Sequence, residues 1–128
     1  MNQRSILYWV LVAIAAATVL TGATQVIAPG FVLGTISAQI PPTTSHFFGI
    51  VGMFMVLFGG MTLHVLLGTA TEPVALLWAG FQKFGASIAV GLGVSRGVFS
   101  SLGLLVACFD LLSGILILAY WNQVRRRA

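Results

Sequence analysis

Apolar residues occupy four continuous runs along the chain, separated by shorter segments that carry glycine, proline and polar residues. The runs cover about residues 6–27, 45–67, 74–94 and 99–121, each close to the ~20 residues that a helix needs to cross a bilayer. They lack the alternation of apolar and polar positions that marks a β-strand, so helices rather than a barrel satisfy the backbone in lipid. The pattern predicts one all-α domain, residues 1–128, folded as an antiparallel bundle of four transmembrane helices.

The first connection between the runs, residues 28–44, is the longest. It holds Pro29-Gly30 and Pro41-Pro42 on either side of a modestly apolar stretch, residues 31–40. Proline and glycine interrupt it too often for a fifth span. The stretch suits a short re-entrant segment or one that lies in the membrane interface.

Capping and turn residues in the connections predict where the helices begin. The hydroxyl side chains of residues 43–45 offer an N-cap for the second helix, and Thr71, in the connection of residues 68–73, offers one for the third. Residues 95–97 are the centre of a third connection, which is short enough to predict a tight hairpin between the third and fourth helices.

Small residues recur at spacings of three and four, which places them on one face of a helix. The first helix has Ala13, Ala17 and Thr21, the third has Gly85, Ala89, Gly93 and Gly97, and the fourth has Gly103, Ala107, Asp110 and Gly114. Small residues let helix backbones approach closely in lipid. We therefore expect these faces to be packing faces, with the third and fourth helices tightly paired.

The composition agrees with a membrane location. The 128 residues are 59% hydrophobic and 6% charged, with a mean hydropathy of +1.06, whereas about a quarter of the residues in a soluble domain are charged. The main partner of this surface is therefore the lipid bilayer. A signal peptide cleaved near Ala23 is an alternative for the first run, but the run continues to about Ile27, which favours a retained helix.

The net charge of +4 does not indicate nucleic-acid binding, because three of the six basic residues form one run, residues 125–127. Such a run beside a span is typical of the cytoplasmic side and of anionic headgroups. An even number of spans puts both termini on one side, and Arg4 strengthens the prediction that this side is cytoplasmic. Arg96, on the opposite side of the membrane, is a single exception to this distribution of basic residues. A bacterial inner membrane or a thylakoid-type membrane fits this orientation.

Two charged residues interrupt the apolar runs, Lys83 in the third and Asp110 in the fourth. Counted from the inner ends of their runs, they lie about nine and about eleven residues deep, which is the same depth within about one helical turn. An unpaired charge at the bilayer centre costs at least ~2.5–3.5 kcal/mol, which favours an ion pair. The pair is interpreted as a structural ion pair that holds the bundle together. Alternatively, it is a proton- or ligand-binding site, and Gln82 could supply further hydrogen bonds.

The two histidines are candidate axial ligands of a haem or a chlorophyll. His46 and His64 lie five turns apart on one face of the second helix, with their backbones roughly 27 Å apart by helix rise. A haem held by two histidines needs both at one depth, so only a single axial histidine is compatible with this chain. The alternative is a histidine that binds headgroups, water or another helix. A relay from His64, through water or Gln82, to Lys83 and Asp110 is a further hypothesis. No metal-binding cluster or catalytic constellation occurs in the sequence.

Glycine and proline within and between the runs give a recognisable layout. The relevant stretches are Ala28-Pro29-Gly30, Phe48-Gly49-Ile50-Val51-Gly52-Met53, Gly59-Gly60 and the run around Lys83. Over most of the chain this layout resembles the small four-span bacterial membrane proteins of the DoxX-like type. The resemblance implies a partner-subunit role rather than a particular chemistry. The small multidrug transporters have a similar size, but they depend on a glutamate in the first helix, and the first run here has no acidic residue.

These observations favour a non-enzymatic accessory or scaffold subunit of a larger membrane complex, with other membrane protein subunits as partners. In one variant, His46 or His64 binds a pigment or a haem, as in photosynthetic or respiratory complexes. The alternative is a small proton-coupled transporter that uses Lys83 and Asp110 and oligomerises to enclose a path. A membrane enzyme acting on a lipid or a quinone is a third hypothesis, weakened by the scarcity of acid–base groups.

Overall fold

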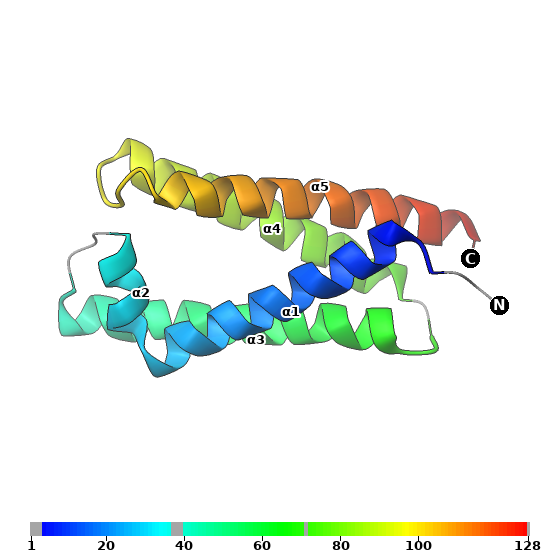
Figure 1. The fold of residues 1–128 in the computed structure, drawn as a ribbon, viewed down its shortest axis with the longest axis horizontal. Coiled ribbons are helices and arrows are strands. Elements are labelled where there is room, and N and C mark those ends of the chain that lie inside the picture. Colours follow the sequence, from blue (N-terminus) through cyan, green and yellow to red (C-terminus); the bar gives the residue numbers. More distant parts are fainter. Residues whose placement is uncertain (1–3, 37–39, 71, 128) are drawn as a thin grey trace.

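The computed structural model describes residues 4–36, 40–70 and 72–127. These residues form helices and the turns that connect them (Figure 1). In chain order the helices are α1 (Ile6–Ile27), α2 (Pro29–Thr35), α3 (Pro42–Leu67), α4 (Pro73–Ser95) and α5 (Gly103–Arg127). All except α2 are long and apolar enough to cross a membrane. The chain is therefore an all-α integral membrane protein, and the predicted four-helix bundle is confirmed.

The short helix α2 lies in the first connection, where the sequence predicted an interfacial or re-entrant segment. Pro29 occupies its first turn, where a fixed φ and a missing N–H are tolerated. Leu33 is 1% exposed whereas Phe31 is 72% exposed, so one side of α2 packs on the bundle and the other faces outward. With seven residues, α2 is too short to cross a bilayer.

The starts of α3 and α4 differ from the sequence prediction. Pro41 is the N-cap of α3 and makes no side-chain hydrogen bond, so residues 43–45 lie inside the first turn instead of capping it. Pro42 starts the helix because its ring already fixes the helical φ. Glu72 is the N-cap residue of α4, also without a side-chain hydrogen bond. The predicted cap, Thr71, lies outside the described residues.

The end of α4 is set by Gly97, whose φ is 72°. The amide of Val98 donates to the carbonyl oxygen of Gly93 at 2.8 Å, and the amide of Gly97 donates to that of Val94 at 3.1 Å. These two bonds make a Schellman motif, in which a residue in the left-handed region closes the helix. Glycine takes that conformation without the steric penalty of a Cβ.

Both ends of α5 differ from the predicted range of about 99–121. The helix begins at Gly103, and the residues before it form a turn in which the amide of Ser100 donates to the carbonyl oxygen of Ile36 at 3.0 Å. The helix continues to Arg127. Cations in the last turn interact favourably with the negative end of the helix dipole, which supports this extension beyond the apolar run.

The four long helices form two antiparallel pairs, with α1 packed along α3 and α4 packed along α5 (Figure 1). The end at which α1 begins and α5 ends is termed the proximal end, and the opposite end the distal end. A hydrophobic core near the proximal end joins the two pairs. It consists of Tyr8, Leu11, Ile14, Leu66, Leu76, Ala79, Ile117 and Val124.

Glycines bring the backbones of α1 and α3 into direct contact. A Cβ added to Gly22 would lie 2.6 Å from the carbonyl oxygen of Gly52, and one added to Gly52 would lie 2.6 Å from that of Gly22. The buried positions of α1 include Leu11, Ala15, Thr18, Gly22 and Gln25. The predicted small-residue face of α1 is therefore wrong, since Ala13 and Thr21 are exposed.

In the second pair, the predicted face of α5 is buried: Gly103, Ala107, Asp110 and Gly114. The predicted face of α4 needs correction, because Gly85 and Ala89 are exposed and no atom lies within 4 Å of a Cβ built on Gly85. Gly93 instead packs against Phe99 in the turn.

The reason for this correction is helix geometry. The residues of α4 that meet α5 include a regular series, Gly80, Lys83, Ser87, Val90 and Val94. Their alternating spacings of three and four keep one face toward a partner helix. Each step of four residues advances about 40° around the helix axis, so a stripe spaced by four turns away from that partner.

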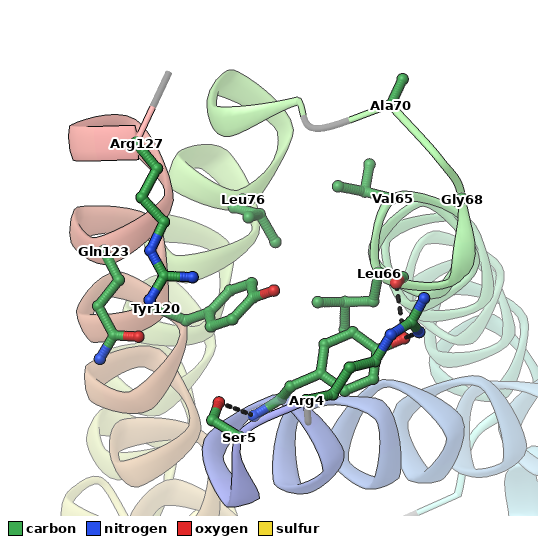
Figure 2. A pocket seen from close by; sticks show the side chains of 11 residues that line it. Arg4, Ser5, Val65, Leu66, Gly68, Ala70, Leu76, Tyr120, Gln123 and Arg127 are labelled. Atoms are coloured by element: carbon green, nitrogen blue, oxygen red, sulfur yellow. Dashed lines mark hydrogen bonds between the residues drawn. The ribbon is translucent and has the colours of Figure 1, made fainter. Parts of the chain in front are cut away.

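Polar contacts fasten α1 to α3 at the proximal end (Figure 2). Tyr8 is 4% exposed, and its hydroxyl donates to the carbonyl oxygen of Leu66 at 2.7 Å while accepting from the Arg4 guanidinium. The Ser5 side chain caps α1 by accepting from the amide of Tyr8 at 3.2 Å. Burying the tyrosine is tolerated because its hydroxyl is fully used.

Candidate functional site

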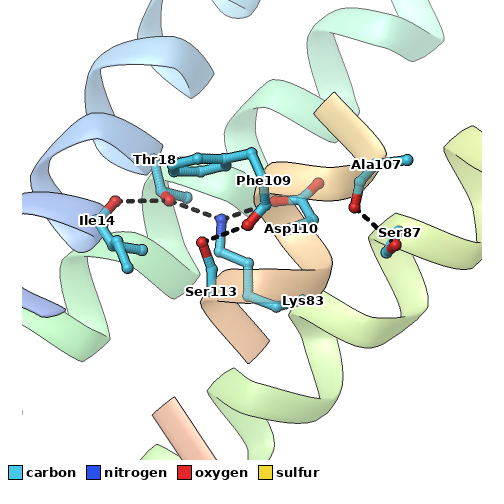
Figure 3. A network of polar contacts seen from close by, with 8 residues as sticks. All are labelled: Ile14, Thr18, Lys83, Ser87, Ala107, Phe109, Asp110 and Ser113. Atoms are coloured by element: carbon cyan, nitrogen blue, oxygen red, sulfur yellow. Dashed lines mark hydrogen bonds and ion pairs between the residues drawn. The ribbon is translucent and has the colours of Figure 1, made fainter. Parts of the chain in front are cut away.

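Lys83 of α4 and Asp110 of α5 form an ion pair in the middle of the bundle (Figure 3). Nζ of Lys83 lies 3.1 Å from Oδ1 of Asp110, and the two side chains are 6% and 11% exposed. The structure thus brings together the two charged residues that the sequence places at one depth. Two buried charges need such pairing because each has lost its hydration shell.

The third member of the site is Thr18 of α1. Nζ of Lys83 donates to Oγ1 of Thr18 at 2.8 Å, and the threonine hydroxyl donates in turn to the carbonyl oxygen of Ile14 at 2.9 Å (Figure 3). Thr18 belongs to the other helix pair, so the ammonium connects α4 and α5 with α1. The site is a polar bridge between the two halves of the bundle.

Small residues make room for this bridge. A Cβ on Gly114 would lie 3.3 Å from both the Lys83 Cβ and the Gly80 carbonyl oxygen, so a larger residue there would push α4 away from α5. The ring of Phe109 covers the ammonium, with 5.3 Å between Nζ and the ring centroid. The face of an aromatic ring attracts a cation in a water-poor environment.

Two serines add hydrogen bonds beside the ion pair. The hydroxyl of Ser87 on α4 donates to the Ala107 carbonyl oxygen on α5 at 2.8 Å, about one turn from Lys83. The hydroxyl of Ser113 donates to the carbonyl oxygen of Phe109 within α5 at 2.6 Å. The bond from Ser87 fixes how α4 is positioned along α5, which holds the two charges opposite each other.

A small cavity of about 10 Å³ adjoins Lys83, between residues of all four long helices. Its lining includes Gln82, Thr18 and Thr62, which are polar enough to hold water. This volume corresponds to about one water molecule. Gln82 faces this cavity, whereas the hydrogen bonds of the ammonium to described residues go to Asp110 and Thr18.

The two histidines lie apart from this site. His64 is exposed on α3 and neither lines the small cavity nor hydrogen-bonds to the ion pair, so the structure does not assemble the proposed relay from His64. His46 lies near the distal end of α3, where it lines an apolar groove of about 780 Å³ between α1 and α3. Gly49 and Met53 line the same groove.

Metal-binding side chains do not gather in the part of the chain that the structure describes. Over those residues, no three histidine, cysteine or acidic side chains lie close enough to hold a metal ion. Cys108 is a free thiol on the exposed side of α5. The chemistry that the described residues assemble is therefore a charged hydrogen-bond network inside the bundle.

Thr18 is the member of the site that the sequence analysis missed. The small-residue face predicted for α1, Ala13, Ala17 and Thr21, lies on a different side of the helix. Alternating spacings of four and three, starting from Leu11, would have indicated Thr18 as an inward-facing residue. The sequence offers no signal that pairs this hydroxyl with Lys83 in particular.

Comparisons of this chain with protein families, with curated proteins and with solved structures found no match. The assignment of a function therefore rests on the geometry of the bundle and its polar site.

Proposed function

We propose that this protein is an accessory or scaffold subunit of a larger membrane complex, with other membrane proteins as its partners. The observation that carries the proposal is the bridge from Lys83 to Asp110 and Thr18. The hydrogen bonds of the ammonium to described residues both go to other helices, so the buried charge is used to hold the bundle together. A stiff bundle suits a subunit that positions other chains.

The exposed face of α4 supports the same proposal. Gly85 and Ala89 lie on the outside of the bundle, with open space around Gly85. Small residues at this spacing allow a helix of another subunit to approach closely. The large apolar side chains Phe81, Ile88 and Leu92 are exposed on the same helix and suit contact with lipid or protein.

The test is the size of the native complex in mild detergent. We expect the wild-type protein to migrate with a complex much larger than its own 13.5 kDa. Gly85→Leu/Ala89→Leu should release the protein from that complex without lowering its thermal stability. Ala119→Leu, at an exposed alanine of α5, is the control and should stay bound. Migration of the wild type as an isolated small protein would contradict the proposal.

A pigment or haem variant of this proposal uses His46 rather than His64. His46 lies at an apolar groove large enough for part of a macrocycle, and Gly49 leaves space beside it. The absorption spectrum of the native complex tests this variant. His46→Ala should remove a visible band and His64→Ala should retain it, whereas a colourless complex contradicts pigment binding.

The alternative is proton-coupled transport through Lys83 and Asp110. The water-sized cavity beside Lys83 favours this candidate, since intramembrane ionisable groups often serve as proton relays. Proton flux into proteoliposomes should then fall in both Lys83→Met and Asp110→Asn. Equal flux in empty liposomes and in liposomes with the wild-type protein would remove this candidate.

We also propose that the proximal end faces the cytoplasm of a bacterial or thylakoid-type membrane. Four arginines, Arg4 and residues 125–127, lie at this end against Arg96 at the distal end, and such an excess of basic residues favours the cytoplasmic side. We further propose that the chain is related to the DoxX-like proteins.

The orientation is tested by labelling with a membrane-impermeant maleimide. The reagent should label Ser95→Cys in a Cys108→Ala background in intact cells, and labelling only after lysis would reverse the orientation.

A further inference from the structure

A pocket at the proximal end has the properties of an anion site, and no role in the proposed function depends on it. We infer that this pocket binds a phosphate group, which in the membrane is the headgroup phosphate of an anionic phospholipid. The inference is independent of the ion pair in the middle of the bundle and of any partner subunit.

The pocket has a volume of about 420 Å³, within the ~300–1,000 Å³ that is usual for small-ligand sites. It opens between the start of α1, the end of α3, the start of α4 and the end of α5 (Figure 2). The inner part of its wall is apolar, with Leu66 and Leu76 buried. The outer part is polar. A phospholipid presents the same order, with its charged headgroup outside and its apolar chains inside.

The charge of the lining is positive. Arg4 and Arg127 contribute guanidinium groups, and none of the described lining residues is acidic. The two acidic residues of the chain lie elsewhere, since Asp110 pairs with Lys83 and Glu72 is exposed outside this lining. Two cations with no acidic side chain among the described lining residues favour an anion in the space that they share.

The pocket offers several hydrogen-bond donors to a phosphate group, from both its neutral and its charged side chains. The hydroxyl of Tyr120 and the guanidinium of Arg127 point toward the pocket interior, and Gln123 lies on the same wall (Figure 2). Arg4 is held against Tyr8, with 4.6 Å between its Cζ and the ring centroid. A guanidinium has five N–H donors, so the bond from Arg4 to Tyr8 leaves donors for a ligand. A planar guanidinium can donate two parallel hydrogen bonds to two oxygens of one phosphate group.

The depth of the pocket fits the headgroup region. Tyr8 and Tyr120 line it, and Trp9 and Trp121 follow them along the chain. Tyrosine and tryptophan concentrate where the hydrocarbon core meets the headgroups. The arginines lie just beyond this belt, at the depth where phospholipid phosphates are found.

The experiment measures lipid binding to the full-length chain in a non-ionic detergent by native mass spectrometry. The probes are phosphatidylglycerol and phosphatidylcholine with identical acyl chains. We expect one phosphatidylglycerol to bind at least about tenfold more tightly than phosphatidylcholine, because only the first carries net negative charge. Equal affinity for the two lipids would overturn the inference.

Variants that lose the same number of charges distinguish binding in the pocket from a general attraction between the basic C-terminus and an anionic lipid. Arg4→Gln/Arg127→Gln should weaken phosphatidylglycerol binding about tenfold, whereas Arg125→Gln/Arg126→Gln should change it by less than about twofold. Both variants lose two positive charges, but only the first loses pocket residues. Equal losses in the two variants would overturn the inference.

A single variant covers the case in which loss of the Arg4–Tyr8 contact unfolds the protein. Arg127→Gln, in the last turn of α5, should weaken binding more than Arg126→Gln does, with both proteins melting like the wild type. Equal binding by these two variants would also overturn the inference. Millimolar inorganic phosphate identifies the source: competition assigns the site to phosphate in general, and no competition assigns it to the lipid headgroup.

Discussion

Thr18 on α1 accepts a hydrogen bond of 2.8 Å from the Lys83 ammonium on α4, across the boundary between the two helix pairs. The same ammonium is paired with Asp110 on α5. A single positive charge on α4 therefore contacts two other helices, the neighbouring α5 and the sequence-distant α1. In a hydrocarbon environment, polar contacts of this kind help decide which helices are neighbours.

The ion pair predicts a strong asymmetry between single and double substitutions. Asp110→Asn leaves a buried ammonium without its counter-ion and should lower the free energy of unfolding by about 3–5 kcal/mol. Lys83→Met should have a comparable effect through the unpaired carboxylate. Unfolding by SDS titration in mixed micelles measures both.

The control is the double variant Lys83→Met/Asp110→Asn, which removes both charges and keeps the side-chain volumes similar. It should lose less stability than either single variant, because it leaves no buried charge without a partner. Additive losses in this double-mutant cycle would show that the two side chains do not stabilise each other.

The bridge to the other helix pair predicts a smaller effect at Thr18. Thr18→Val keeps the shape of the side chain but removes the acceptor for the Lys83 ammonium, so the free energy of unfolding should fall by about 1 kcal/mol. Thr24→Val is the matched control, because Thr24 makes the same bond to the carbonyl four residues before it but is exposed. Equal effects at the two threonines would mean that the bond to Lys83 adds no stability.

The close contact of α1 and α3 predicts that Gly52 does not tolerate a side chain. Gly52→Ala would place a methyl group 2.6 Å from the Gly22 carbonyl oxygen, and separating the helices should cost about 1–3 kcal/mol. Gly60→Ala, on the same helix with no atom within 4 Å of the new methyl group, is the control. Thermal unfolding in detergent should show a lower midpoint for the first variant only. A normal midpoint for Gly52→Ala would refute the contact.

The turn between α4 and α5 predicts a backbone effect at Gly97. Its φ of 72° costs roughly 1–2 kcal/mol for a residue with a Cβ, so Gly97→Ala should destabilise the bundle by about that amount. Gly91→Ala, inside α4 with open space around it, should be neutral or stabilising by up to ~1 kcal/mol. If both variants unfold at the same midpoint, the left-handed conformation of Gly97 is not what ends α4.

The sequence was sufficient for the properties that depend on position along a helix. Continuous apolar runs determine that there are four spans, because the hydrocarbon core accepts only helices of that length. The rise per residue determines depth, and for this reason Lys83 and Asp110 could be paired from the sequence alone. The rise per residue also showed that His46 and His64 lie at opposite ends of one span.

The tertiary structure decided the properties that depend on rotation about each helix and on the choice of neighbour. It paired α1 with α3 through Gly22 and Gly52, turned Gly85 and Ala89 outward, and brought Thr18 to the ion pair. In lipid, an apolar side chain is about equally well solvated on any side of a helix. Hydrophobicity therefore determines where a span lies in the membrane, and close backbone packing and buried hydrogen bonds determine which side faces which helix.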